Sequence, residues 1–133
     1  MTSNLGFCES ISAANVWRLD RTFFPSKVGG LPVWLVPDVQ NIPTCCDQCK
    51  SKLRFLMQIY SPGSGESAFH RTIFVFVCSS KNFCQAPPVI FRQQLMQNNK
   101  YYPSEAPNYE VRNLKLSIKS IKLLVIAKYN LPD

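Results

Sequence analysis

Six cysteines carry the clearest chemistry in this sequence, and four of them are spaced as metal ligands. Cys46 and Cys49 form a Cys-x-x-Cys pair, and Cys78 and Cys84 form a second, wider pair later in the chain. Two such pairs of thiolates are the ligands that structural zinc sites use, with four sulfurs in a tetrahedron around the ion. We therefore predict one structural zinc ion bound by Cys46, Cys49, Cys78 and Cys84.

Two predicted strands explain how the two cysteine pairs would meet. Residues 53–60 alternate between two faces, with Leu53, Phe55, Met57 and Ile59 on one and Arg54, Leu56, Gln58 and Tyr60 on the other. Residues 72–77 are apolar at nearly every position, which is typical of a strand covered on both faces. Antiparallel pairing of residues 53–60 with 70–77 places residue 53 opposite about residue 77. Both cysteine pairs then lie at one end of a zinc-ribbon-like hairpin.

Other interpretations of the cysteines stay open at this point. They could be buried and reduced without a metal. Cys46 and Cys49 could also form a redox pair, although no thioredoxin-like strand and helix frame them. Cys45 is an alternative ligand to Cys46, but it breaks the Cys-x-x-Cys spacing. Cys8 is far away in the sequence and is interpreted as an ordinary apolar residue.

The single histidine, His70, is excluded as a ligand by the same hairpin. It lies at the end opposite the cysteines, and about eight residues at ~3.3 Å each separate it from them by over 20 Å. That separation also argues against a Cys–His nucleophile pair. The eight acidic residues are scattered, without a paired arrangement for acid–base catalysis. We expect no enzymatic activity and a packed, hydrogen-bonded His70.

Length and composition indicate one globular domain. The chain has 133 residues, 46% of them hydrophobic, which is enough for a single modest core. No secretion signal is apparent, and no apolar run approaches the ~20 residues that cross a bilayer. We expect a soluble, intracellular protein without a membrane partner, where thiols stay reduced and cysteines favour metal binding over disulfides.

The charge is unevenly distributed along the chain. The formal net charge is +7, and residues 111–133 contribute +4 of it. This basic tail fits both a strand and an amphipathic helix, and we favour the helix, with Asn113 as its N-cap. No cluster of interleaved arginines and aromatics marks a nucleic-acid site.

The predicted fold is a β-rich α+β domain. An antiparallel hairpin with zinc-ribbon-like knuckles of four cysteines is extended by one or two strands, of which residues 89–95 supply one. The amino-terminal region packs across this hairpin. The expected organisation is an amino-terminal region at 1–26, the zinc-ribbon-like β domain at 27–96, a polar linker at 97–110 and an atypical basic tail at 111–133.

Several segments occur in an order that resembles the programmed cell death protein 2 family. They are KVGGLPVWL, CDQCKSKLRFLMQIYSP, AFHRTIFVFVC, VIFRQQL and NKYYP. The resemblance covers roughly residues 20–103. Family members are typically much longer. We therefore expect this chain to represent the amino-terminal half, with a domain that is incomplete relative to the family.

The resemblance implies a non-enzymatic chaperone. It would bind a newly made, very basic protein of the small ribosomal subunit and hand it on for 40S ribosome biogenesis. It also implies zinc ligation by Cys46, Cys49, Cys78 and Cys84, and a mainly cytoplasmic protein with nuclear traffic. We expect partner binding at an exposed strand edge and at Trp34, Tyr60, Phe69, His70 and Arg71. Phe74 and Phe76 belong to the same group of aromatics, and core packing is the alternative role for all these rings.

Two alternative functions remain at the level of sequence. A zinc-ribbon module could contact RNA through basic residues near the cysteines, namely Lys27, Lys50, Lys52 and Arg54. RNA is the less favoured partner. The chain could also be a generic protein-interaction domain in apoptosis or transcription, as the family name suggests.

Overall fold

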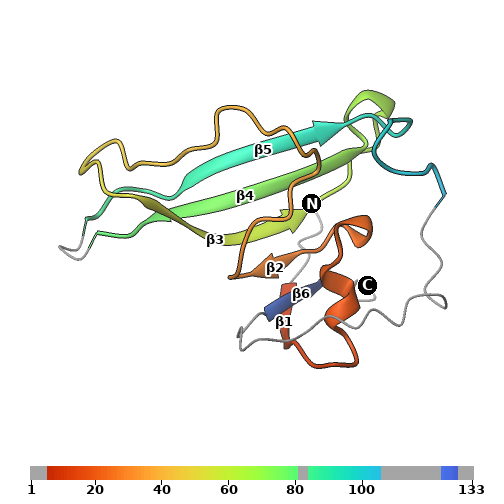
Figure 1. Ribbon diagram of the computed structural model, residues 1–133, viewed down its shortest axis with the longest axis horizontal. Helices are drawn as coiled ribbons and strands as arrows, with labels where there is room; N and C mark the ends of the chain where they lie inside the picture. The colour runs from red at the N-terminus through yellow and green to blue at the C-terminus, as the bar shows by residue number, and fades with distance from the viewer. Residues whose placement is uncertain (1–5, 81–83, 106–123, 129–133) are drawn as a thin grey trace, which may run out of the picture.

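The computed structural model describes residues 6–80, 84–105 and 124–128. A six-stranded antiparallel sheet in the order β1-β6-β2-β3-β4-β5 dominates it (Figure 1). The strands are β1 (Gly6–Ser10), β2 (Lys27–Val28), β3 (Leu53–Tyr60), β4 (His70–Cys78), β5 (Val89–Leu95) and β6 (Leu124–Lys128). The helical elements of the described ranges are three short 3-10 helices, η1 (Val16–Leu19), η2 (Arg21–Phe23) and η3 (Glu66–Ala68). The β-rich prediction is confirmed, and the helical part of an α+β fold is limited to these three turns.

The predicted hairpin and third strand are present. Strands β3 and β4 pair with Leu53 opposite Cys78, one position from the expected partner. Strand β5 covers the predicted range and pairs antiparallel with β4. The sheet also extends from the other side of the hairpin, where β2 pairs with β3. The hairpin therefore lies in the interior of the sheet, and the two edge strands of the sheet are β1 and β5.

A β-bulge overturns part of the predicted facing of β3. Phe55 pairs with Phe76, but Met57 pairs with Val75, so Leu56 is an extra residue in the strand. An extra residue reverses the face of every side chain that follows it. Gln58 thus lies on the same face as Phe55, contrary to simple alternation, and it is 1% exposed.

The register defines two faces of the sheet. We call one the covered face; it carries Phe55, Gln58, Tyr60, His70, Thr72, Phe74, Phe76, Phe91 and Gln93. We call the other the open face; it carries Val28, Arg54, Met57, Ile59, Arg71, Ile73, Val75, Val77, Ile90, Arg92 and Gln94. The core lies on the covered face, where Phe74 and Phe76 are buried.

The loop after β2 closes over the covered face. Gly29 and Gly30 have φ of 78° and 70°, a left-handed conformation that glycine adopts without steric cost. Beyond them, the ring of Trp34 lies 4.5 Å from that of Phe74 and 5.8 Å from that of Phe91. Leu35, next in the chain, is 2% exposed.

The buried side chain of Lys27 stabilises the start of this loop. Its ammonium donates hydrogen bonds to the carbonyls of Gly29 and Leu31 and lies 5.0 Å from the centre of the Phe55 ring. The residue is 2% exposed, and burial lowers the pKa of its ammonium to about 8. The lysine thus supplies the donors that this turn lacks.

In the described residues, the amino-terminal region packs against one end of the hairpin. The Phe24 ring stacks on Tyr60 and His70 at centroid distances of 4.8 and 4.4 Å. Tyr102, which lies in the predicted polar linker, is 6% exposed and donates a hydrogen bond to the Leu35 carbonyl. The described part of that linker is therefore joined to the core by this side chain.

The predicted tail helix is wrong where the tail is described. Leu124–Lys128 forms β6, which lies between β1 and β2. Pairing with β1 on one side and β2 on the other satisfies the backbone hydrogen bonds of this apolar segment. The sequence pattern alone fitted both a strand and a helix. The remainder of residues 111–133 lies outside the described residues. No helix in the described ranges has the length and apolar character needed to span a bilayer.

Candidate metal centre

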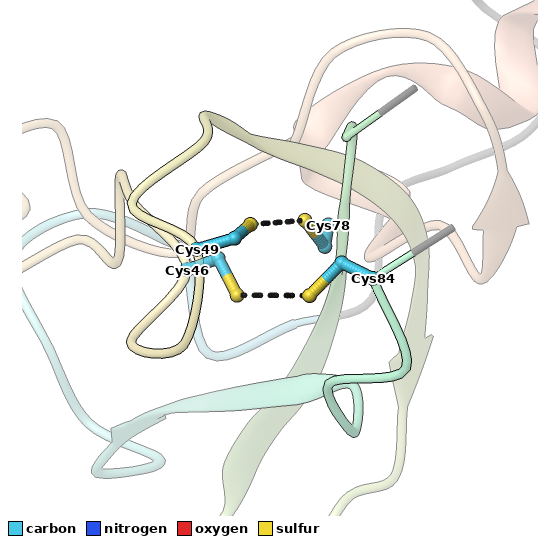
Figure 2. Close-up of side chains that lie close together, drawn as sticks. All are labelled: Cys46, Cys49, Cys78 and Cys84. Carbon is cyan, nitrogen blue, oxygen red and sulfur yellow. Dashed lines mark hydrogen bonds between the residues drawn. The ribbon is translucent and has the colours of Figure 1, made fainter. Parts of the chain in front are cut away.

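Four cysteines converge at one end of the β3–β4 hairpin. The Sγ atoms of Cys46, Cys49, Cys78 and Cys84 all lie within 4.8 Å of one another. Figure 2 shows two facing pairs, with Sγ–Sγ distances of 3.9 Å for Cys46–Cys84 and 3.3 Å for Cys49–Cys78. The predicted convergence of these side chains is confirmed.

A tight turn presents the first pair. The Lys50 N–H donates to the Cys46 carbonyl at 2.9 Å, and the Cys46 N–H donates to the Ser51 carbonyl at 2.8 Å. Lys50 has a φ of 58°, so the chain reverses immediately after Cys49. The turn brings both thiols of the Cys-x-x-Cys pair to one side of the loop (Figure 2).

The end of β4 presents Cys78, the first cysteine of the second pair. Cys78 is the last residue of β4, and the Ser80 N–H donates to its Sγ at 3.4 Å. Ser79 ties this end to the first knuckle, because its N–H and its hydroxyl both donate to the Lys52 carbonyl. The hairpin register therefore fixes the position of Cys78 relative to the first pair.

The thiols differ in acidity. Hydrogen bonds from the Ser51 side chain and backbone, with a smaller contribution from Cys78, lower the pKa of Cys49 to about 6. For Cys78, the Ser80 N–H lowers the pKa, but burial and the neighbouring thiols outweigh it and raise the pKa to about 12. Of these two thiols, Cys49 is therefore the more acidic. Metal ligation uses the thiolate form, so a bound cation would favour deprotonation of the ligand cysteines.

The donor set fits a tetrahedral zinc ion. Four sulfurs bound at ~2.3 Å to one ion lie about 3.8 Å from each other, which falls within the range of these Sγ–Sγ distances: 3.3 and 3.9 Å in the facing pairs and at most 4.8 Å overall. Four soft thiolates without an oxygen ligand favour zinc over magnesium or calcium. Such a set fills the coordination shell and leaves no position for a substrate.

The other candidate ligands lie outside the cluster. Cys45 is exposed and its Sγ contacts the Thr44 hydroxyl, while Cys8 is exposed in β1 rather than packed as an apolar side chain. His70 is at the opposite end of β4, 6% exposed, with its Nδ1 2.9 Å from the Tyr60 hydroxyl. Its predicted hydrogen bond and packing are confirmed, and burial lowers its pKa.

The residues predicted to bind a partner are mostly engaged within the fold. The Trp34 and His70 rings pack against other aromatics, and the Arg71 guanidinium donates to the Ser61 carbonyl at 2.9 Å. Tyr60 and Phe69 are partly exposed. Phe74 and Phe76 are buried at 0% and 5% exposure, so these two rings belong to the core and offer no partner surface.

The proposed RNA-contact set loses one member. Lys27 is buried, because the loop after β2 folds over its ammonium. Lys50, Lys52 and Arg54 are exposed beside the cysteine cluster. Lys52 and Arg54 are two residues apart, so their side chains lie on the same face.

Sequence reasoning missed two supports of the cluster. One is Ser51, whose hydrogen bonds lower the pKa of Cys49, and the other is Gln48, whose Oε1 lies 3.9 Å from the Cys84 Sγ. Gln48 lies within the Cys-x-x-Cys segment, and Ser51 lies two residues after it. Uncharged polar side chains at those positions were the available signal.

Comparison with known proteins places this domain in a family context. Residues 2–109 match the family model described as programmed cell death protein 2, N-terminal domain. The programmed cell death protein 2 of Mus musculus is 42% identical over 109 residues, which is 78% of this chain and 30% of that protein. The Rattus norvegicus protein is 41% identical over 113 residues, 81% of this chain and 31% of that protein.

A more distant relative also matches. The Mus musculus programmed cell death protein 2-like is 35% identical over 75 residues, covering 54% of this chain and 20% of that protein. No solved structure matches. The chain thus spans about 30% of the length of the relatives with the higher identities.

Proposed function

The chain belongs to the programmed cell death protein 2 family, and we propose that it is a non-enzymatic, chaperone-type protein for a newly made protein of the small ribosomal subunit. The client would be held for assembly into 40S subunits. The observation that carries this proposal is the match to the family's N-terminal domain over residues 2–109. We place this activity in the cytoplasm, with nuclear traffic.

The proposed role of the four-cysteine cluster is structural. One zinc ion would be held by Cys46, Cys49, Cys78 and Cys84, and it would supply four bonds that lock the end of the β3–β4 hairpin. The support is the thiol-only donor set and the mutual distances of at most 4.8 Å between ligand atoms. A small sheet with a one-sided core gains stability from such a cross-link, because the metal is bound in the folded state only.

The geometry also supports a non-enzymatic role. Four cysteines face one another in a set that closes a metal's coordination shell. His70 is occupied by Tyr60 at the other end of β4, so a Cys–His nucleophile pair does not form between these residues. Binding rather than catalysis is the activity that these side chains favour.

RNA binding is a second candidate with its own observation. Lys50, Lys52 and Arg54 are exposed around the knuckle, and no ion pair to a carboxylate is found for them in the described part of the chain. If these residues contact phosphates, affinity for single-stranded RNA should fall steeply as salt rises. Affinity that is absent at low salt, or unchanged in Lys52→Glu with Arg54→Glu, would remove this candidate.

The zinc proposal is tested by metal analysis of the purified chain. We expect one zinc per chain, with metal and cooperative thermal unfolding both lost in Cys49→Ser and in Cys84→Ser. Cys45→Ser is the matched control, because this neighbouring thiol is exposed and outside the cluster. A zinc-free chain that still unfolds cooperatively would leave the four cysteines without a metal role.

The client proposal is tested with purified ribosomal proteins. Each small-subunit protein is mixed with the chain during dilution from denaturant, and light scattering reports its aggregation. We expect one of them to be kept soluble in a stable complex, while basic proteins of the large subunit are not. Equal and weak effects on all basic proteins would contradict a dedicated client.

A further inference from the structure

The open face of the sheet carries side chains that are usually found inside a protein. Val28, Met57, Ile59, Ile73, Val75 and Val77 are half-buried on it, and Ile90 is 59% exposed. In an antiparallel sheet with one solvated face, that face is normally polar. A surface of aliphatic side chains on four neighbouring strands, β2 to β5, therefore indicates a second layer that packs there.

The described elements do not provide that layer. The main contacts of β3, β4 and β5 with other described elements are within the sheet, apart from η3 beside β5. Figure 1 likewise shows these three strands as a single layer, without a helix or second sheet stacked on them. Within the described ranges, the apolar character of residues 72–77 thus has a covering partner on one face only.

The charges around the open face define the chemistry of what fits it. Arg54 and Arg92 are exposed at its margin, and Lys52 continues the row beyond β3. Strands β3, β4 and β5 contain no acidic residue, and the ion pair found in the described residues, Arg18–Glu9, lies elsewhere. A second copy of this face would bring like charges together, which disfavours symmetric pairing of two chains. Carboxylates around an apolar centre would be complementary.

The length of the relatives points to the source of that surface. The matched domain is N-terminal and makes up about 30% of the rodent proteins, so most of each polypeptide follows it. A domain with one uncovered aliphatic face, tethered to a much longer chain, has a covering partner at high effective concentration.

We propose that the open face is a docking surface for an apolar, carboxylate-rimmed surface presented by the part of the family polypeptide that follows this N-terminal domain. Ile73, Val75 and Ile90 form the centre of the contact, and Arg54 and Arg92 form its rim. The ribosomal client plays no part in this inference, so the two proposals fail independently.

Carbene footprinting of two intact proteins tests the docking. In this chain, Ile73, Val75 and Ile90 should be labelled by a photoactivated diazirine. In full-length Mus musculus programmed cell death protein 2, the aligned positions should be labelled at least about fivefold less, since buried core residues exclude the probe. Leu31, at 83% exposure on the loop after β2, is the internal control and should be labelled similarly in both. Equal labelling of the open face in both proteins overturns the proposal.

Self-association is distinguished in the same samples. Sedimentation should show this chain as a monomer at the labelling concentration. A dimer whose open face is already protected would assign the surface to a second copy and overturn the proposed occupant.

Paired substitutions test the contact energetically. Ile90→Asp should lower the Tm of this chain by less than about 2 °C, and Asp at the aligned position of the full-length mouse protein should lower it by at least about 5 °C. Leu31→Asp should be tolerated in both proteins. Similar small shifts at the Ile90 position in both would contradict docking.

The rim is tested by charge reversal. Glutamate at the positions of Arg54 and Arg92 in the full-length mouse protein should raise labelling of the open face at least about twofold through like-charge repulsion. Glutamate at the position of Lys100, away from this sheet face, is the control. Unchanged labelling would show that the covering surface is not acidic.

Discussion

The covered and open faces of the β3–β4–β5 sheet combine polarity and burial in opposite ways. The covered face buries Gln58, His70 and Thr72 among its aromatics, at 1%, 6% and 1% exposure. The open face carries valine, isoleucine and methionine side chains that are half-buried, and Ile90 on it is exposed. Burial by side-chain hydrophobicity alone would predict the reverse arrangement.

The nature of the covering element explains the polar residues. The loop after β2 donates one backbone hydrogen bond to β3, from the Gly29 N–H to the Leu56 carbonyl, but its residues over the covered face lie in no strand or helix, and buried N–H and C=O groups require hydrogen bonds. Gln58 accepts from the Val33 N–H at 2.8 Å and donates to the Pro25 carbonyl at 2.8 Å, while Gln93 accepts from the Leu35 N–H at 2.9 Å. Polar side chains on this face therefore substitute for missing secondary structure.

The same reasoning indicates what suits the open face. A regular helix or sheet satisfies its own backbone and needs only apolar contacts from the surface beneath it. The aliphatic composition of the open face thus matches a regular element as its cover. Taken together, the two faces indicate that the polarity of a sheet depends on the structure of the layer above it as well as on exposure to water.

The largest contrast between the faces is expected from truncation to alanine. Phe74→Ala should lower the free energy of unfolding by about 3–5 kcal/mol, because it leaves a cavity under Trp34 in the core. Val75→Ala, one residue along on the open face, should cost less than about 1 kcal/mol. Urea unfolding of both variants measures the difference. Similar losses would mean that the open face is buried in the isolated chain.

The second contrast concerns buried hydrogen bonds. Gln58→Leu should cost about 2 kcal/mol, because the Val33 N–H and the Pro25 carbonyl lose their partner while remaining buried. Gln94→Leu, the matched change on the open face, should alter the free energy of unfolding by no more than about 0.5 kcal/mol. Thermal unfolding of the two variants tests this. A neutral Gln58→Leu would show that water replaces the lost amide.

The strand pattern made much of this arrangement predictable. Alternation and the cysteine spacing indicated the hairpin, its end and the third strand, because a period of two and a Cys-x-x-Cys pair can be recognised in short stretches of sequence. The bulge at Leu56 was not predictable, since the extra residue is tied to a contact distant in sequence, its carbonyl accepting from the Gly29 N–H at 2.7 Å. The faces predicted for the side chains after Leu56 were consequently the reverse of those observed.

The burial of polar residues was the other feature that the sequence did not predict. Lys27 was assigned to a solvent-exposed basic set, as composition favours, but its ammonium is needed by two loop carbonyls. The convergence of Cys46, Cys49, Cys78 and Cys84 could be predicted from the spacing of the two cysteine pairs and from the hairpin, which brings Cys78 back to the first pair. The β6 strand could not, because its partners β1 and β2 lie far away in sequence.

A third, smaller contrast is a pH dependence specific to the covered face. Burial lowers the pKa of His70, so the unfolded chain takes up a proton at a higher pH than the folded chain does. Stability from this group is therefore present above the unfolded pKa of about 6.5 and is lost as pH falls towards the folded pKa. Urea unfolding between pH 5 and pH 8 should show this component in the parent chain and not in His70→Gln. An identical profile in both would assign no role to His70.

The smallest effect is expected at the margin of the open face. Ile90→Thr should change stability by less than about 0.5 kcal/mol, since the side chain is 59% exposed and threonine suits a strand. It should nevertheless reduce binding of an apolar dye such as ANS. Arg92→Lys, which keeps the charge, should leave dye binding unchanged. If Ile90→Thr leaves dye fluorescence unchanged, the apolar surface that binds the dye lies elsewhere.

The pairing of β1 with β6 has a consequence for the order of events during synthesis. Gly6 faces Lys128, so the amino-terminal strand meets a partner that leaves the ribosome more than a hundred positions later in the chain. The β3–β4–β5 meander joins neighbours in sequence and can form while the chain is still growing. Until residues 124–128 emerge, β1 and the outer side of β2 remain unpaired edges, the kind of surface on which nascent chains associate wrongly. The meander would then fold early and fast, and closure of the sheet would be the late, slow step.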